Sequence, residues 1–266
     1  MTTFLRWAGS KRRLIPRLME VVPPNFDRYV EPFAGSACLF FALRPPRAIL
    51  GDINGDLVDC YRALKADVEA VINLLTSFRC TEPEYYQVRN QDTCAETRER
   101  RAARFIYLNR LCFNGLYRTN RQGRFNVPYG GQKAGALPRP ELLRECSRSL
   151  GHTKLHAGSF EKTLGKVRRN DFVYIDPPYS IKARRVFNEY SNFGFGDEQL
   201  RNLRTHLLRM DRDGARFLVS YGVSHEAKEL ARGFDFREIV VQRQIAGFAN
   251  KRRKSRELLI TNYPLQ

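Results

Sequence analysis

Long hydrophobic runs are missing from the 266-residue sequence. No stretch of about 18 consecutive apolar residues occurs, which is the length that a helix needs to cross a membrane, so no membrane partner is expected. The first residues, Met1–Trp7, also lack an apolar signal segment, and we expect a cytoplasmic location. Hydrophobic residues still make up 42% of the chain, which is enough for a core and argues against disorder.

Cysteine and histidine are scarce and poorly spaced for binding a metal. None of the six cysteines forms a Cys-x-x-Cys pair, which excludes a zinc ribbon, and their scatter does not indicate a disulfide framework. Four histidines include the pair His152 and His156, but no glutamate or cysteine partner completes a zinc site. We therefore expect no metal at the functional site.

Acidic residues are also few. The chain has 28 Asp and Glu against 46 Lys and Arg, which gives a net charge of +18. The positive electrostatic field of such a chain attracts polyanions. Because the chain has no basic amphipathic anchor, nucleic acid is a better candidate for the partner than a membrane surface. On charge alone, the alternative is a solvated arginine-rich surface that binds no such partner.

We expect the protein to be a monomer.

Apolar segments alternate with helix-like segments along the chain. Several apolar runs are nearly continuous, as in strands that are covered on both faces. The expected strands span 28–33, 48–53, 154–157, 171–175, 216–221, 238–242 and 257–261. The expected helices span 36–43, 54–66, 139–150, 197–210 and 224–231. This alternation predicts an α/β fold with a mostly parallel sheet, and the close spacing of the last strands predicts an antiparallel terminal hairpin.

Residues 67–138 interrupt this rhythm. They contain no strand run of comparable quality and are typical of helices followed by a loop region rich in Gly, Asn and Arg. Between Arg98 and Lys133 nine residues are basic and only Glu99 is acidic. We interpret 67–138 as an inserted, mainly helical domain with a cationic face, and 1–66 with 139–266 as the domain around it. A second basic segment, 250–256, is expected to be a loop that binds phosphate or is simply solvated.

The strongest candidate for a reactive site follows the apolar strand 171–175. There the sequence reads Asp176-Pro177-Pro178-Tyr179, and ligands of open parallel sheets bind beyond the carboxyl ends of the strands. The two prolines leave carbonyl oxygens without competing donors, while Asp176 supplies an acceptor and Tyr179 a flat face. This set suits a planar base with an exocyclic amine. A plain strand-ending turn is the alternative.

Two earlier turns are candidates for holding a ligand. The strand ending at Glu31 runs through Pro32 and Phe33 into the small residues Ala34 and Gly35, which let a ligand approach the backbone. Neither the GxGxxG dinucleotide fingerprint nor a phosphate-binding P-loop is present, and an ordinary βα turn is the alternative.

The second of these turns lies after the next strand. Its Asp52 is placed to accept hydrogen bonds from ribose hydroxyls, and the alternative is that an Asp or Asn of this turn only caps the following helix.

The only tryptophan, Trp7, lies beside a Gly-Ser turn and Lys11, where it either packs in the core or covers a cofactor. Together and in this order, the motifs resemble DNA adenine-N6 methyltransferases of the Dam type, and the resemblance extends over nearly the whole chain. The segments that carry it are 6–11, 31–35, 52–54, 107–110, 113–116, 123–128, 176–179 and 257–263.

The resemblance implies a Rossmann-like methyltransferase sheet, an inserted DNA-recognition domain and S-adenosylmethionine as cofactor, without a metal. Asp52 would hold the ribose, Ile53 would pack on the adenine of the cofactor, and Asp176 would face both the methionyl amino group and the target base. The cofactor residues implied by the resemblance are Trp7, Ala8, Gly9, Lys11, Pro32, Phe33, Ala34, Gly35, Asp52, Ile53, Ser159, Phe160 and Asp176.

The implied reaction is methylation of N6 of an adenine flipped out of double-stranded DNA. The sulfonium methyl group is already activated, so no nucleophilic side chain is required. Hydrogen bonds from the amine to Asp176 and to the Pro177 carbonyl would stabilise the charge that develops on nitrogen, and Tyr179 would stack on the base. Alignment of the amine nitrogen, the methyl carbon and the sulfur would supply the rest of the lowering of the activation barrier.

DNA recognition is implied for eight residues, which are Arg6, Phe113, Asn114, Leu116, Arg118, Asn126, Pro128 and Lys133. Arg118 matches an arginine that reads a guanine in the major groove, and Phe113 stands where an aromatic ring inserts beside the flipped base. The alternative for this stretch is phosphate contact without sequence information. Arg6 and Ser10 stand where the family commonly has Lys and Gly, and the expected target is GATC or a related short site.

Three other functions compete with this interpretation. Methylation of RNA adenine or of cytosine N4 are the nearest alternatives, but Asp rather than Ser at position 176 favours adenine, and the insertion favours DNA. A catalytically silent DNA-binding protein would have no reason to keep all five of Trp7, Lys11, Asp52, Asp176 and Tyr179. The expected biological settings are restriction–modification, a phage or gene regulation.

Overall fold

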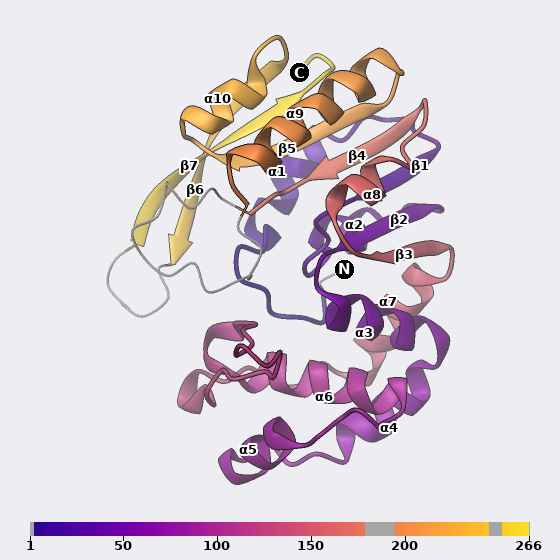
Figure 1. Ribbon diagram of the computed structural model, residues 1–266, viewed down its shortest axis with the longest axis vertical. Helices are drawn as coiled ribbons and strands as arrows, with labels where there is room; N and C mark the ends of the chain where they lie inside the picture. The colour runs from indigo at the N-terminus through magenta and orange to yellow at the C-terminus, as the bar shows by residue number, and fades with distance from the viewer. Residues whose placement is uncertain (1–2, 179–194, 245–251, 266) are drawn as a thin grey trace. The chain divides into compact units, whose positions relative to one another are not determined.

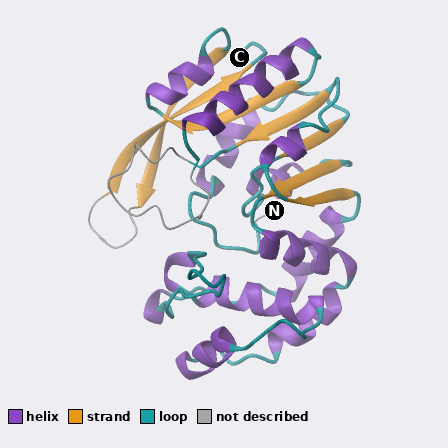
Figure 2. Ribbon diagram, viewed as in Figure 1, coloured by secondary structure: helices purple, strands orange, loops and turns teal. Residues whose placement is uncertain are grey.

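The computed structural model of the protein describes residues 3–178, 195–244 and 252–265. Within these ranges, seven strands form one mixed sheet in the order β3-β2-β1-β4-β5-β7-β6 (Figures 1 and 2). The strands are β1 (Arg28–Glu31), β2 (Ala48–Asp52), β3 (Thr153–Ala157), β4 (Asp171–Ile175), β5 (Arg216–Gly222), β6 (Asp235–Gln244) and β7 (Arg252–Thr261). Each predicted strand is confirmed, 171–175 with the predicted bounds and the others with a shift at one or both ends.

The sheet is mostly parallel. Strand β1 pairs in parallel with β2 and β4, and β4 pairs in parallel with β5. Strand β7 is antiparallel to both β5 and β6, which confirms the predicted hairpin and the α/β fold class. The expectation of a loop at 250–256 is wrong for 252–256, because the long strand β6 supplies backbone partners for these residues.

The five predicted helices are all present, as α2, α3, α7, α9 and α10. The helices in the described ranges are α1 (Ile15–Glu20), α2 (Cys38–Leu43), α3 (Gly55–Ala66), α4 (Val68–Thr76), α5 (Glu82–Asn90), α6 (Arg98–Leu111), α7 (Pro140–Leu150), α8 (Phe160–Leu164), α9 (Asp197–Arg212) and α10 (His225–Ala231), with short 3-10 turns η1 (Arg12–Leu14), η2 (Phe113–Gly115) and η3 (Gly131–Lys133). Helix α2 begins later than predicted because Gly35 and Ala37 both have φ of 48°, outside the helical region.

The chain divides into two compact units. Unit 1 consists of Met1–Arg12, Gly35–Arg44 and Asp52–Gly158, and unit 2 consists of Arg13–Ala34, Pro45–Gly51 and Ser159–Gln266. Residues 67–138 lie wholly within unit 1, and their separation as an inserted domain stays a prediction.

In unit 2 one face of the sheet forms an apolar core. Every second residue of the strands contributes to it, as expected for a covered face, and α8, α9 and α10 supply the other side (Figure 1). Helix α9 contributes leucines at helical spacing to this core. The acidic residues in its first turn and the arginines in its last turn interact favourably with the helix dipole. The core includes Val30, Val173, Ile175, Val219, Leu203, Leu207, Met210, Leu230 and Ile260.

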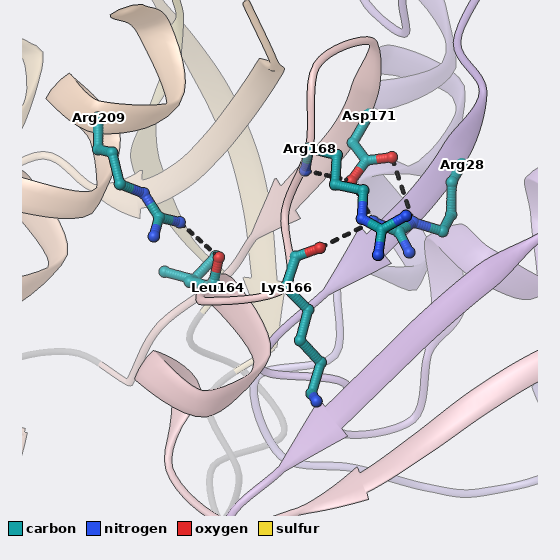
Figure 3. Close-up of polar contacts among 6 residues, drawn as sticks. All are labelled: Arg28, Leu164, Lys166, Arg168, Asp171 and Arg209. Atoms are coloured by element: carbon teal, nitrogen blue, oxygen red, sulfur yellow. Dashed lines mark hydrogen bonds and ion pairs between the residues drawn. The ribbon is translucent and has the colours of Figure 1, made fainter. Parts of the chain in front are cut away.

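The first residues of β1 and β4 are joined by a nearly buried ion pair (Figure 3). Arg28 donates from Nη2 to Asp171 Oδ2 at 2.6 Å and from Nε to Oδ1 at 3.2 Å, and its Nη2 also donates to the Lys166 carbonyl. The Arg168 N–H donates to the same carboxylate at 2.8 Å. Because Arg28 and Asp171 are also register partners, this pair fixes how β1 and β4 align.

Replacing Asp171 with Ala is therefore expected to lower the free energy of unfolding by about 3 kcal/mol, because the guanidinium of Arg28 loses its charged partner in a mostly buried position. Urea unfolding followed by circular dichroism measures the change. Asp213→Ala is the matched control, since the Arg212–Asp213 pair is exposed and is expected to contribute less than about 1 kcal/mol. Equal effects of the two substitutions would contradict this role for the pair.

In unit 1, helices α3, α4, α6 and α7 pack on one another, and α6 contacts both α3 and α4. The buried side of α6 includes Ala103, Ile106 and Tyr107. After α6 the chain forms turns with isolated bridges between Cys112 and Tyr129 and between Thr119 and Phe125. The predicted succession of helices followed by loops in 67–138 is confirmed. Among the described residues of both units, no helix combines the length and the apolar character needed to cross a membrane.

Candidate active site

The strand order of the sheet reverses between β1 and β4. Strand β1 has β2 on one side and β4 on the other, so successive strands are added in opposite directions from this point. Ligands of open α/β sheets bind at such a switch point, beyond the carboxyl ends of the strands. The Glu31-Pro32-Phe33 segment continues β1 there, and Asp176-Pro177 continues β4. The two motifs predicted from sequence thus follow neighbouring strands of unit 2.

Asp176 is held by hydroxyl groups from β5 and β4. The hydroxyl of Ser220, which is fully buried, donates to Asp176 Oδ1 at 3.2 Å and lies 2.9 Å from the hydroxyl of Tyr174. Burial, and next the charge of Asp176, raise the pKa of Tyr174 well above its usual range, so its hydroxyl stays protonated and donates to Ser220. The result is a chain of hydrogen bonds from Tyr174 through Ser220 to the carboxylate.

Two further carboxyl groups are buried on this side of the sheet. Glu31 is 2% exposed and accepts a hydrogen bond from the Tyr29 hydroxyl at 2.9 Å. Glu257, which is 1% exposed, pairs with Gly222 at the end of β5. After burial and the charge of Asp176, the charges of Glu31 and Glu257 also raise the pKa of Tyr174. The buried Glu31 and Glu257, together with the half-buried Asp176, suit a cationic ligand.

An aromatic cluster of unit 2 joins two of the predicted cofactor residues. The rings of Phe33 and Phe160 are stacked with centroids 5.1 Å apart, and Phe195 lies 5.8 and 5.9 Å from them. Ser159 precedes α8 as its N-cap residue, and the Ala34 N–H donates to the Gly51 carbonyl at 2.8 Å. Phe195 was not predicted, since it is far from both partners in sequence.

In unit 1 the carboxylate of Asp52 organises the turn after β2. Its Oδ2 accepts the Gly35 N–H at 2.8 Å, and its Oδ1 accepts the Asn54 N–H at 2.9 Å. Asn54 in turn caps α3 by accepting the Leu57 N–H, so the predicted capping alternative holds for the Asn of this turn and not for Asp52. Burial raises the pKa of Asp52, and the backbone hydrogen bonds oppose the shift. Ile53 is 54% exposed.

The tryptophan of the N-terminal motif lies against the Gly35 turn. A Cβ atom on Gly35 would lie 2.9 Å from Cδ1 of Trp7, and the Tyr61 hydroxyl donates to the Gly35 carbonyl at 2.6 Å. Since Gly35 also has positive φ, only glycine fits here without strain. Ala8 and Gly9 are exposed in the turn that follows Trp7, whereas Lys11 is buried.

Comparison with known proteins decides the class of this site. The sequence matches the D12 class N6 adenine-specific DNA methyltransferase family over residues 7–245. The chain belongs to this family. A type II methyltransferase of Lactococcus lactis subsp. cremoris is 36% identical over 98% of this chain and 95% of its own length. A DNA adenine methylase of Haemophilus influenzae is 31% identical over 96% of this chain and 92% of its own length.

The predicted enzyme class is thereby confirmed as an adenine-specific DNA methyltransferase, with DNA as its substrate. The competing interpretations as an RNA or cytosine methyltransferase, or as a silent binding protein, are set aside. Methyltransferases of this kind generally use S-adenosylmethionine. In the described part of the chain, no group of three or more His, Cys, Asp or Glu residues is arranged to hold a metal ion.

The residues with predicted DNA contacts lie in unit 1. Phe113 is 37% exposed, and its N–H donates to the Pro128 carbonyl at 2.9 Å. Arg118 donates from Nε to Asn126 Oδ1 at 2.7 Å, so these two predicted residues meet. Asn114 has φ of 55°, Leu116 is half-buried and Lys133 is exposed. Their contacts with DNA stay predictions.

Arg6 of the methyltransferase holds several loops of unit 1 in place. Its backbone N–H and C=O pair with the side-chain amide of Asn109 at 2.8 and 2.6 Å. Its guanidinium donates to the carbonyls of Arg110 and Lys133 at 3.2 and 3.3 Å. A Cβ atom on Gly115 would lie 2.5 Å from Cβ of Arg6, so the glycine is needed for this close packing.

Several arginines of the basic stretch bind protein carbonyls, a role that sequence reasoning missed. Arg104 donates to the carbonyls of Val88 and Arg89, and Arg110 donates to that of Ala136. Arg101 donates to the Glu96 carbonyl at 2.8 Å. These contacts satisfy backbone groups at helix ends and in loops, so part of the positive charge serves the fold.

Among the functional residues that sequence reasoning missed, Ser220 is the best placed. Its only signal in the sequence is a serine hydroxyl within the hydrophobic run 217–221 of strand β5. Ser220→Ala is expected to lower kcat by about tenfold to a hundredfold, since a hydrogen bond to a charged group contributes roughly 1.5–3 kcal/mol. Ser149→Ala is the control, because that hydroxyl bonds only within its own helix. Wild-type kcat in Ser220→Ala, measured by methyl transfer at saturating substrates, would contradict the role.

Proposed function

We propose that this enzyme uses S-adenosylmethionine to methylate N6 of an adenine that has left the stack of double-stranded DNA. The observation that carries the proposal is the Asp176 carboxylate, which follows β4 beside the switch point and is held by Ser220. During methyl transfer, positive charge develops on the nitrogen of the adenine amine. A carboxylate held in a fixed position next to a proline carbonyl stabilises that charge by accepting the hydrogens of the amine.

The residues present fit the proposed cofactor. Its sulfonium and ammonium charges suit the buried carboxyls near Tyr174, its adenine suits an apolar aromatic surface, and its ribose suits the Asp52 side chain as a hydrogen-bond acceptor. Phe33 and Phe160 form such a surface in unit 2. Trp7, Ala8, Gly9, Lys11, Pro32, Ala34, Gly35, Ile53 and Ser159 complete the proposed set. When bound, the cofactor supplies an activated methyl group.

The protein's own residues then have distinct roles. Asp176 and the Pro177 carbonyl accept the hydrogens of the target amine and favour its pyramidal form. Ser220 keeps the carboxylate oriented by donating to its Oδ1. Tyr179, proposed to stack on the target base, lies outside the described residues.

For DNA binding we propose that residues 67–138 act as a mainly helical recognition domain inserted in a Rossmann-like methyltransferase sheet. The net charge of +18 supports binding of a polyanion. Arg118 reads a guanine, Phe113 enters the stack beside the flipped base, and Leu116 and Pro128 meet a thymine methyl group. Arg6, Asn114, Asn126 and Lys133 complete the proposed contacts. The proposed target is GATC or a related short site, read by a cytoplasmic monomer.

The test is transfer of a radiolabelled methyl group from S-adenosylmethionine to unmethylated duplex DNA, followed by digestion to nucleosides. We expect the label in N6-methyldeoxyadenosine and little transfer to RNA of the same sequence. Label in N4-methyldeoxycytidine, or no transfer to DNA, would overturn the proposal. Sequencing of DNA from cells that express the protein then gives the target site.

A further inference from the structure

A small hairpin carries the proposed guanine-reading residue. Residues 117–126, here named the recognition hairpin, pair across a turn: the Asn126 N–H donates to the Arg118 carbonyl at 3.1 Å, and the Asn120 N–H donates to the Arg124 carbonyl at 2.9 Å. The bridge between Thr119 and Phe125 lies between these two bonds. The position of Arg118 therefore depends on what holds the base of the hairpin.

Tyr117 holds that base through its ring and its hydroxyl. Its hydroxyl donates to Asp56 Oδ2 at 2.5 Å. Its ring lies 6.0 Å from that of Trp7, nearly parallel at 24°, and it also contacts Phe105 at 5.5 Å and Phe125 at 5.7 Å. Burial, and next the charge of Asp56, raise the pKa of Tyr117, so the hydroxyl remains a donor near neutral pH.

Both partners of Tyr117 adjoin residues of the proposed cofactor site. Asp56 lies in the first turn of α3, whose cap Asn54 donates to Asp52. Trp7 lies against Gly35, whose N–H donates to the other oxygen of Asp52. Two short series of contacts thus lead from the Asp52 carboxylate to the residue next to Arg118, all within unit 1.

We propose that Tyr117 is a positioning residue that sets the orientation of Arg118 toward DNA and couples it to cofactor binding. The inference rests on the proposed function, because it takes Asp52 as a cofactor residue and Arg118 as the reader of a guanine. Packing alone requires only the ring of Tyr117. The Tyr117 hydroxyl adds a directional hydrogen bond to the exposed carboxylate of Asp56. In the proposal, a ligand bound at Asp52 strengthens or releases this hydrogen bond.

The experiment compares wild type with Tyr117→Phe, Asp56→Ala and the double variant. First, kcat/KM is measured on the target duplex and on one in which the guanine pair is replaced. We expect each single variant to lose about tenfold in this discrimination, and the double variant to lose no more than either. Arg118→Ala gives the loss expected when the reader itself is absent, and Tyr86→Phe on α5 is the matched control.

The second measurement is the affinity for a fluorescent target duplex with and without S-adenosylhomocysteine. We expect the effect of this cofactor product on DNA affinity to shrink in Tyr117→Phe and to persist in Tyr86→Phe. Urea unfolding accompanies both measurements. If Tyr117→Phe is destabilised, Asp56→Ala gives the same test from an exposed position.

The proposal is wrong if Tyr117→Phe and Asp56→Ala keep wild-type discrimination and the wild-type response to S-adenosylhomocysteine. It is also wrong if the losses in the double variant are additive, since independent packing effects would then explain them. Failure of the proposed function gives a different result: the wild type itself would not methylate adenine in DNA, or would not bind S-adenosylhomocysteine.

Discussion

Asp176→Asn is expected to lower kcat for methyl transfer by about a hundredfold to a thousandfold, which is the range found when one preorganised electrostatic partner of a transition state is removed. Asparagine keeps the shape of the side chain and still offers one oxygen to Ser220. It loses the negative charge, however, and its NH2 group, which takes the place of the second oxygen, cannot accept a hydrogen bond from the target amine. The positive charge that develops on the nitrogen is then left without a counter-charge.

Transfer of radiolabel under saturating cofactor and duplex separates this loss from weaker binding. Affinity for S-adenosylhomocysteine, measured by calorimetry, is expected to change far less than kcat. Asp213→Asn is a suitable control, because that carboxylate is exposed and pairs only with its neighbour Arg212. If Asp176→Asn turned over at the wild-type rate, the carboxylate would not be the catalytic acceptor, whatever its position in the fold.

Asp52→Asn is expected to weaken cofactor binding by about tenfold or more, because a hydrogen bond to a charged group contributes roughly 1.5–3 kcal/mol. Both carboxylate oxygens already accept backbone N–H groups, from Gly35 and Asn54. Asparagine has only one side-chain oxygen, so its NH2 group would face one of these two N–H donors. It also lacks the negative charge that strengthens hydrogen bonds from the ribose hydroxyls. Calorimetry with S-adenosylhomocysteine measures the effect, and Asp59→Asn, elsewhere on α3, is the control.

The same carboxylate predicts a pH dependence. Burial raises the pKa of Asp52, so between its unfolded and folded values the folded protein binds more protons. Stability is therefore expected to fall slightly as pH rises through that window and to stay level above it. Cofactor affinity should rise through the same window, because the ionised form accepts the ribose hydroxyls. If the affinity for the cofactor still rose with pH in Asp52→Asn, the rise would be due to another titrating group.

Much of the fold follows from local sequence. Continuous apolar runs such as 171–175 predict buried strands, because a strand that is covered on both faces has apolar side chains on both and does not alternate with polar ones. Asp176 and Asp52 could be placed at strand ends for the same reason, since each directly follows such a run. Helices α1 and α8 were missed because each is short and offers too few residues for a helical period to emerge.

What the sequence by itself determined is the enzyme class, the order of strands and helices, and the chemistry available at the strand ends. Only the tertiary structure decided which distant groups meet. It places β7 between β5 and β6, sets Ser220 on Asp176, sets Tyr117 on Asp56, and directs Arg104 to backbone carbonyls. The physical reason is that a hydrogen bond depends on distances and angles between atoms, and across such sequence separations these follow from packing of the whole core.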